Sequence, residues 1–341
     1  MEAAQLVHVH RGKMLESVHK GHIAVVDSDG NLLYQAGNPQ QMVYARSSMK
    51  PVQAIPLIET GAADFYHFDD ADIALCCASH NAEKQHTNRV LSILSRIGLD
   101  VKDLQCGTHN PRWEEVYEEL IREGKPVTAL FNNCSGKHSG MLTTAQHMNE
   151  TVDDYYKLDH PVQQRILEAI SSLAEFPKEK IEIGIDGCGV PVHGMPLDKL
   201  AYCYARMANP TGLSNERTTA VKRIAQAMMN APEMVGGTNR FCTDFMRVAQ
   251  GRAFGKAGAE AVYCIGDIET GIGIAIKVED GNGRGTEPVA VEVLKQLNLL
   301  TDEQLEQLKG YHYPQLKNCR QETIGQLSPV FQLKSAKKHI Q

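Results

Sequence analysis

The feature that most constrains the fold of this sequence is a pair of strand-forming regions, one close to each end of the chain. At 22–37, HIAVVDSDGNLLYQAG, two apolar runs flank an Asp-Ser-Asp-Gly-Asn segment typical of a tight hairpin turn. At 259–280, the runs AEAVYCIGD and GIGIAIKVED are rich in β-branched residues and are separated by a short turn. We therefore expect an antiparallel sheet built from both ends of the chain.

The region between these strand pairs shows helical periodicity. Apolar side chains recur at spacings of three and four residues over 90–97 and again over 162–173. Two further helices are expected after the second strand pair, at 288–296 and 302–309, where they would cover the outside of the sheet.

The overall composition is that of a globular protein with a large core. The 341 residues are 42% hydrophobic and 22% charged, so the chain can bury enough apolar surface to fold alone. We predict an α/β fold of the α+β type, an antiparallel sheet flanked by helices, in one domain over 1–341. A mainly helical middle region is expected at about 85–235.

Charge, apolar segments and cysteines limit the partners and the location. A formal net charge of −6 argues against nucleic-acid binding. No window approaches the roughly 18 apolar residues of a membrane helix, and the N-terminal MEAAQLVHVH lacks the apolar core of an export signal. The nine cysteines are odd in number and scattered, unlike the framework of a secreted disulfide protein. We therefore expect a cytoplasmic protein without a membrane partner.

The segment YARSSMKPVQAI contains the first candidate catalytic residues. Ser47 and Lys50 are three residues apart, so on a helix a neutral lysine would be close enough to remove the serine proton. This role requires burial of Lys50, which would lower its pKa. The alternative is that Ser47 or Ser48 caps a helix, and Pro51 disfavours helix at the residue before it.

Two later segments strengthen the catalytic interpretation. CCASHNAE contains Ser79, His80 and Asn81, and FGKAG contains Lys256. In chain order, Ser-x-x-Lys, Ser-x-Asn and Lys-x-Gly resemble the three elements around the active serine of β-lactamases and penicillin-binding proteins. We expect Ser79 to relay a proton, Asn81 to hold the substrate amide beside His80, and Lys256 to supply positive potential.

Two glycine-rich segments contain candidate metal ligands. NNCSGKHSG contains Cys134, and GIDGCGVPVHG contains Asp186 and Cys188. These ligand types suit zinc, and the glycines allow the backbone to turn sharply around an ion. The alternative is that both cysteines pack as small buried hydrophobes. His138 and His193 are further candidate ligands or substrate contacts.

Together these segments resemble the Rhizobium-type L-asparaginases, also called the asparaginase II or class 3 family. The resemblance extends over nearly the whole chain. It rests on six blocks in the same order, namely YARSSMKP, CCASHNAE, NNCSGKHSGML, IDGCGVPVHGMPL, VGGTNRFCTDFM and FGKAGAEAVY.

The resemblance implies a fold similar to the serine β-lactamases and glutaminases, with Ser47 as the nucleophile. Two linked Ser-Lys pairs would be completed by Ser79, Lys50 and Lys256. A zinc ion beside the nucleophile is implied, with ligands at Cys134, Lys137, Asp186 and Cys188. The positions that line the family's substrate site fall on Arg46, His138 and Cys242. The resemblance also implies a homodimer.

We therefore expect an asparaginase that hydrolyses L-asparagine to L-aspartate and ammonia through an acyl-enzyme, with zinc orienting the substrate. Glutamine differs by one methylene, which a pocket discriminates by only roughly 1–3 kcal/mol, so a glutaminase remains open. A β-lactam or D-alanyl peptide hydrolase of the same fold is a second alternative. A non-catalytic, zinc-stabilised binding protein is a third.

Overall fold

The computed structural model describes residues 2–336, which form two compact units. The first, called the sheet unit, is drawn from Met1–Ser48, Met195–Thr211 and Asp244–Gln341. The second, called the helical unit, is drawn from Met49–Gly194 and Gly212–Thr243. None of the described helices is long and apolar enough to span a membrane.

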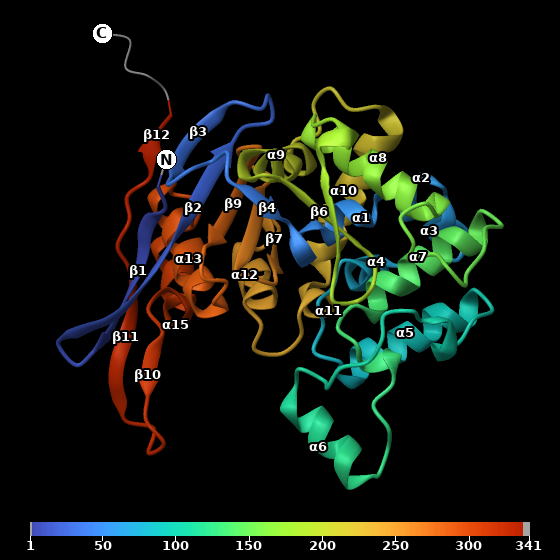
Figure 1. Ribbon diagram of the computed structural model, residues 1–341, viewed down its shortest axis with the longest axis horizontal. Coiled ribbons are helices and arrows are strands. Elements are labelled where there is room, and N and C mark those ends of the chain that lie inside the picture. Colours follow the sequence, from blue (N-terminus) through green and yellow to red (C-terminus); the bar gives the residue numbers. More distant parts are fainter. Residues whose placement is uncertain (1, 337–341) are drawn as a thin grey trace. The chain divides into compact units, whose positions relative to one another are not determined.

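The sheet unit contains a nine-stranded sheet over the described residues. The order is β10-β11-β1-β2-β9-β8-β7, and β3 joins β2 to β12. The strands are β1 (Ala4–Arg11), β2 (Met14–Val26), β3 (Leu32–Ala36), β7 (Ala253–Gly258), β8 (Val262–Asp267), β9 (Ile272–Val278), β10 (Gln315–Lys317), β11 (Thr323–Pro329) and β12 (Lys334–Ser335). Strands β2 and β9 come from opposite ends of the chain and pair antiparallel (Figure 1). The predicted sheet is therefore confirmed.

The turn between β2 and β3 explains why the first predicted hairpin forms. The Asp27 carboxylate accepts hydrogen bonds from the backbone N–H groups of Asp29 and Asn31, and Gly30 adopts a φ of 83°. The second predicted hairpin forms between β8 and β9. Strand β2 begins at Met14, before the predicted segment, because it also pairs with β1, which was not predicted.

Helix α9 (Leu197–Ala208) packs on the sheet at close range. A Cβ atom added to Gly273 of β9 would collide with the carbonyl oxygen of Ala201. One added to Gly266 of β8 would lie 3.0 Å from the carbonyl oxygen of Tyr204. A larger residue at Gly273 would therefore push the helix away from the strands, whereas at Gly266 it would first collide with the Phe254 ring.

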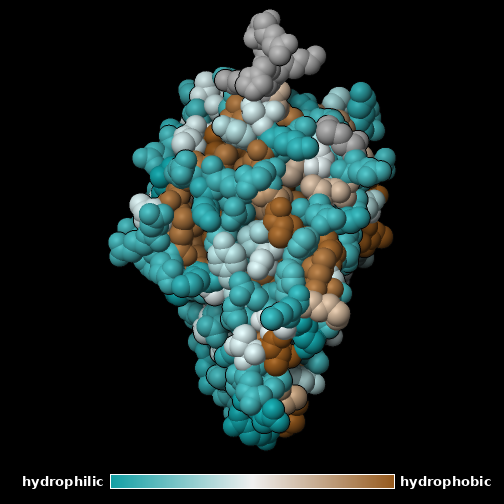
Figure 2. Space-filling view, turned by 90° about the vertical axis from the view of Figure 1, so that its left-hand side faces the viewer, coloured by the Kyte–Doolittle hydropathy of each residue, from teal (hydrophilic) through white to brown (hydrophobic). Residues whose placement is uncertain are grey.

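The C-terminal helices complete the sheet unit. Helix α13 (Thr286–Gln296) packs on the sheet and confirms the helix expected at 288–296. The helix expected at 302–309 is divided into α14 (Asp302–Gln307) and α15 (Lys309–His312). Figure 2 shows one side of the molecule as mostly hydrophilic, with hydrophobic residues in separate groups.

The helical unit consists of short helices and one hairpin. The hairpin is formed by β5 (Glu182–Ile185) and β6 (Pro191–Pro196). The helices are α1 (Lys50–Gln53), α2 (Ile55–Glu59), α3 (Ala62–Phe65), α4 (Asp70–Cys76), α5 (Lys84–Arg96), α6 (Glu114–Arg122), α7 (Ser135–His147), α8 (Pro161–Ala174), α10 (Asn215–Asn230) and α11 (Pro232–Val235). Helices α5 and α8 confirm the two helical periodicities in the middle of the chain.

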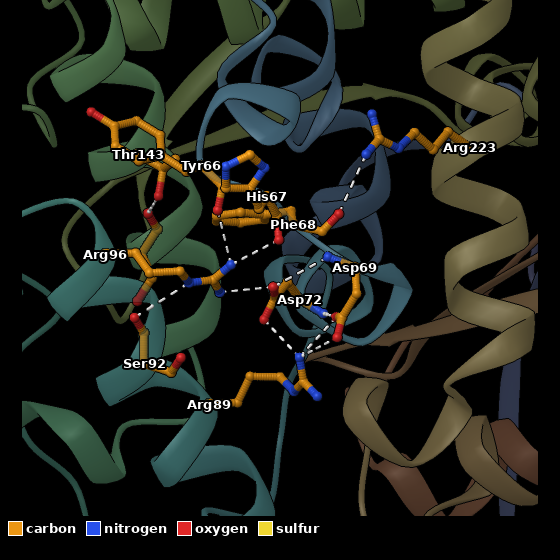
Figure 3. A network of polar contacts seen from close by, with 11 residues as sticks. Tyr66, His67, Phe68, Asp69, Asp72, Arg89, Ser92, Arg96, Thr143 and Arg223 are labelled. Carbon is orange, nitrogen blue, oxygen red and sulfur yellow. Dashed lines mark hydrogen bonds and ion pairs between the residues drawn. The ribbon is translucent and has the colours of Figure 1, made fainter.

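Ion pairs fix helix α4 against α5, as Figure 3 shows. Asp72 of α4 is 2% exposed and accepts Arg89 at 2.8 Å and Arg96 at 2.7 Å. Asp69 caps the N-terminus of α4 and also pairs with Arg89. A buried carboxylate with two guanidinium partners is well compensated, so α4 is held in one position. The chain leaves this helix directly before Ser79.

Helix α7 is buried along most of its length. Its Gly136 and Gly140 lie so close to Leu75 and Cys76 of α4 that Cβ atoms at these glycines would collide with them. Helices α4 and α7 therefore pack with little space between their backbones. This contact brings the start of α7, with Cys134 and Lys137, to the chain segment that follows α4.

Candidate active site

Lys50 is the centre of a buried polar cluster in the helical unit. It is 1% exposed, and its Nζ atom donates to the Ala78 carbonyl at 2.5 Å, the Ser79 hydroxyl at 3.0 Å and the Cys134 sulfur at 3.2 Å. Burial lowers the pKa of Lys50, Cys134 opposes this shift, and the charge of Lys137 adds to it. Lys50 and Ser79 therefore lie within hydrogen-bond distance, although they are far apart in sequence.

The backbone around Lys50 accommodates Pro51 without disruption. Lys50 begins α1, and Pro51 lies in the first turn of the helix, where its missing N–H group leaves no hydrogen bond unmade. The preceding residues Arg46–Met49 form a 3₁₀ turn that contains Ser47. The Ser-x-x-Lys segment is thus a 3₁₀ turn that leads into an α-helix, which resolves the objection that Pro51 raised.

Arg46, Ser47 and Lys256 belong to the sheet unit. Strand β7 carries Lys256, which is 1% exposed, and ends at Gly258. A Cβ atom on Gly258 would lie 2.7 Å from the carbonyl oxygen of Ala45, so the end of β7 runs against the turn that contains Ser47. Within this unit, the turn that contains Ser47 and the strand that carries Lys256 are therefore neighbours.

His80 holds the segment after α4 in place. Its Nδ1 atom accepts the backbone N–H of Ala82 at 3.1 Å, and its Nε2 atom lies 2.9 Å from the Ser135 hydroxyl. Since that hydroxyl donates to the Leu130 carbonyl, it accepts from His80. Both ring nitrogens of this buried side chain are used by the protein itself, which fixes the backbone next to Ser79.

Asn81 lies where three chain segments meet. Its side chain donates to the Thr238 carbonyl at 2.8 Å and accepts from Arg240 at 3.2 Å, and its carbonyl accepts the N–H of Trp113 at 3.3 Å. Arg112 has no hydrogen bond or ion pair among residues 2–336, and burial and then the charge of Arg240 lower its pKa. The sequence analysis did not single out these two arginines, because neither stands at a motif spacing.

Two thiols and a second buried lysine lie next to Lys50. The Nζ atom of Lys137 is 3.0 Å from the sulfur of Cys188, and the Cys134 and Cys188 thiols share a hydrogen bond. This bond lowers the pKa of Cys188 to about 4. The charge of Lys137 adds to the shift, and burial opposes it. The same bond and burial raise the pKa of Cys134 to about 12. A thiolate at Cys188 is thus stabilised chiefly by the hydrogen bond with Cys134, with a further contribution from the charge of Lys137.

The donor atoms at this point match those that bind zinc. The sulfurs of Cys134 and Cys188 and the amine of Lys137 converge, and Asp186 interacts electrostatically with Lys137. In the described part of the chain, no three His, Cys, Asp or Glu side chains are close enough together to hold a metal. Burial opposes the shift, but the charges of Cys188 and Cys134 raise the pKa of Lys137. The residues therefore fit a zinc ion only if the ion displaces the proton of Lys137 and takes its amine as a ligand.

Three further residues complete the description of the site. His138 is fully buried, and its Nδ1 atom lies 2.6 Å from the hydroxyl of Tyr155, which the sequence analysis missed. His193 is 1% exposed, and neither of its ring nitrogens has a hydrogen-bond partner over residues 2–336. Cys242 is buried on α12 (Phe241–Ala249).

Comparison with known proteins decides the family. The family model described as L-asparaginase II matches residues 7–329, nearly the whole chain. The chain belongs to the L-asparaginase II family. This confirms the resemblance that the six sequence blocks carry, and it places the chain among amide-hydrolysing enzymes. A search of curated proteins gives no match.

Two solved structures are similar to this member of the L-asparaginase II family at low sequence identity. A β-lactamase, Mb2281c from Mycobacterium bovis, is 12% identical, with 81% of this chain and 94% of that chain covered and a TM-score of 0.42. A protein described as Mglu is also 12% identical, with 82% of this chain and 67% of that chain covered and a TM-score of 0.41.

Proposed function

We propose that this protein hydrolyses the side-chain amide of L-asparagine, giving L-aspartate and ammonia, with Ser47 as the nucleophile. The observation that carries the proposal is the buried amine of Lys50, which bonds to Ser79 and lies three residues after Ser47. A lysine in such surroundings favours the neutral form, which a general base requires. Membership of the L-asparaginase II family supports an amide as the substrate.

The reaction proceeds by acyl transfer in two steps. Lys50 removes the proton of Ser47, whose oxygen attacks the β-carboxamide carbon, and ammonia leaves after it receives a proton through Lys50 or Ser79. Water then hydrolyses the β-aspartyl ester and restores the serine. Backbone N–H groups stabilise the oxyanion, and Lys256 adds positive potential near the nucleophile.

The zinc ligands in this scheme are Cys134, Lys137, Asp186 and Cys188. When bound, zinc supplies a fixed positive charge that orients the amino or carboxylate end of the substrate. The protein's own residues carry out the proton transfers, so the ion is not needed to activate water. We further propose that Arg46, His80, Asn81, His138 and Cys242 line the substrate site.

The oligomeric state and the location are further parts of the proposal. We propose a homodimer in the cytoplasm, as the family resemblance and the scattered cysteines favour. Analytical ultracentrifugation of the purified chain tests whether it is a dimer. A sedimentation coefficient that matches a monomer at micromolar concentration would contradict the proposed homodimer.

The decisive experiment is ammonia release from L-asparagine by the wild type and by Ser47→Ala. Both proteins are assayed with and without added zinc, and L-glutamine and a chromogenic cephalosporin are tested in parallel. The matched control is Ser48→Ala, which removes a buried hydroxyl that donates to the Ala45 carbonyl. We expect asparagine turnover in the wild type and the control, and none in Ser47→Ala. A folded, zinc-loaded wild type without amidase activity on asparagine would refute the proposed substrate.

A further inference from the structure

A buried chain of hydrogen bonds leads to His138 within the helical unit. The backbone N–H of Gln105 donates to the Tyr155 hydroxyl at 2.9 Å, and that hydroxyl lies 2.6 Å from Nδ1 of His138. The side chains of Tyr155 and His138 are both fully buried. Their rings are nearly perpendicular, at 79°, with centroids 5.5 Å apart. The hydrogen bonds of both side chains are therefore shielded from bulk solvent.

The proton positions follow from the capacity of each group. A backbone N–H can only donate, so the Tyr155 oxygen accepts from Gln105 and still has one proton to place. Over residues 2–336, Nδ1 of His138 is the acceptor that this proton reaches. Nδ1 therefore accepts, and the ring proton of His138 is on Nε2.

The other tautomer satisfies fewer groups. If Nδ1 carried the proton, the Tyr155 O–H would lose its acceptor, and Nε2 would become a second buried group without a partner. With the proton on Nε2, the single unsatisfied atom is Nε2 itself, which has no hydrogen-bond partner in the described part of the chain. Buried polar groups are almost always satisfied, so the Nε2–H tautomer is favoured. Its Nε2–H group is then the one donor of the ring that a ligand can still satisfy.

We propose that Tyr155 is a positioning residue that fixes His138 as the Nε2–H tautomer, so that His138 donates a hydrogen bond to a carbonyl or carboxylate oxygen of the bound amide. This inference rests on the proposed function for the identity of the ligand. His138 lies at the buried cluster because it follows Lys137 on α7, and the amine of Lys137 is 3.0 Å from the Cys188 sulfur. In this form Nε2 has no free lone pair, so His138 neither binds zinc through that atom nor removes a proton from the substrate.

The first test measures the tautomer directly. Long-range ¹H–¹⁵N spectra of the full chain labelled with ¹⁵N-histidine distinguish protonated from unprotonated ring nitrogens, and His138→Gln identifies the resonances that belong to His138. We expect an unprotonated Nδ1 and a protonated Nε2 in the wild type, and a mixture of tautomers in Tyr155→Phe. A wild-type ring with its proton on Nδ1 would overturn the proposal, and this measurement requires no variant to be active.

The second test separates donation from general stability. Tyr155→Phe is expected to lower kcat/KM for L-asparagine by about tenfold, as loss of a partner that orients a site histidine commonly does. The matched control Tyr156→Phe, which removes the hydroxyl of the next residue, should leave kcat/KM unchanged. His138→Gln keeps an N–H donor and should retain more activity than His138→Glu, which only accepts at neutral pH.

The outcomes of the two tests are separable. Equal kcat/KM for Tyr155→Phe and Tyr156→Phe, or a more active His138→Glu than His138→Gln, would overturn the donor role. If the wild type does not hydrolyse asparagine but its spectra show Nε2–H, the proposed substrate fails while the positioning role of Tyr155 stands.

Discussion

The contact of α9 with the sheet and the surroundings of α7 bury different kinds of side chain. Under α9 the sheet has glycine at Gly266 and Gly273, and Gly273 leaves no space for even one methyl group against Ala201. Around α7 the helical unit buries Lys50, Lys137 and His138, each 3% exposed or less. The first arrangement maximises packing, and the second places charge where burial is costly. The difference indicates that one region is selected for stability and the other for reactivity.

The buried polar cluster is tolerable because its members compensate one another. Lys50 has three hydrogen-bond partners, and Lys137 lies against the sulfur of Cys188, which holds negative charge. A lysine without such partners would shift the equilibrium toward the unfolded chain by several kcal/mol. The comparison therefore predicts that variants in the two regions affect different quantities.

The largest expected effect is that of Lys50→Met on turnover. Removing the general base should lower kcat by about a thousandfold, whereas the free energy of unfolding should fall by only about 1–3 kcal/mol, because the buried Ala78 carbonyl loses its donor. Ammonia release and urea unfolding measure the two quantities, and Lys222→Met, at an exposed position on α10, is the control. Unchanged turnover would remove Lys50 from the mechanism and weaken the contrast between the units.

Next in size is the effect of Gly273→Ala on stability. The added methyl group would collide with the backbone of α9, so we expect a loss of about 2 kcal/mol or more in the free energy of unfolding. Turnover per folded molecule should stay the same. In the control Gly283→Ala the added Cβ meets no atom within 4 Å. Equal stability of the two variants would show that the sheet is packed less tightly than its glycines indicate.

Removal of zinc should have an intermediate effect on both quantities. If the ion orients the substrate and the serine performs the attack, chelation should lower turnover by about tenfold without abolishing it. The melting temperature should also fall, because a ligand that binds only the folded state stabilises it. Re-addition of zinc is the control. Complete loss of turnover on chelation, together with an active Ser47→Ala, would make the metal the catalyst.

The smallest expected effect is on stability, and it concerns the ion pairs of α4 outside the buried polar cluster. Partial burial raises the pKa of Asp69, but the N–H of Asp72 and the guanidinium of Arg89 outweigh it, and the net pKa is lowered. The charged form therefore stabilises the fold above the unfolded-state pKa of about 3.9, and this contribution is lost as the pH falls through the lower folded-state pKa.

Asp69→Asn tests this contribution, because asparagine still caps the helix while the charge is removed. Since Asp69 is largely exposed, we expect a loss of less than about 1 kcal/mol at pH 7. The difference from wild type in urea unfolding should disappear well below pH 4, and Asp153→Asn, which removes an exposed carboxylate, is the control. A difference that grows on acidification would contradict the assigned direction of the shift.

Much of the fold could be predicted because its signals are local. Apolar, β-branched runs and turn residues marked the hairpins at 22–37 and 259–280, and apolar spacing marked α5 and α8. Strands β1 and β11 were missed. Strand β11, TIGQLSP, is mostly half-buried and polar, so its pairing with β1 supplies the order that its own sequence does not indicate.

The site was predictable only where motifs have fixed spacing. The spacing of three residues in the sequence identified Ser47 and Lys50 as a pair. No spacing in the sequence shows that Lys50 contacts Ser79 or that Lys137 contacts Cys188. Those contacts depend on tertiary packing, which brings α1 to the segment after α4 and α7 to the turn between β5 and β6. Tyr155 carried no signal at all, because a buried tyrosine in a loop resembles any other core aromatic until its hydroxyl partners are known.

The pairing of β2 with β9 has a consequence for biosynthesis. Gly21 lies opposite Val278, so the N-terminal strands leave the ribosome long before the strand that completes their sheet. At roughly 5–20 residues per second, they wait on the order of ten seconds or longer with one edge unpaired. Such an edge is a template for association with other chains. Nascent molecules of this enzyme should therefore depend on chaperones during translation more than a protein whose neighbouring strands are consecutive.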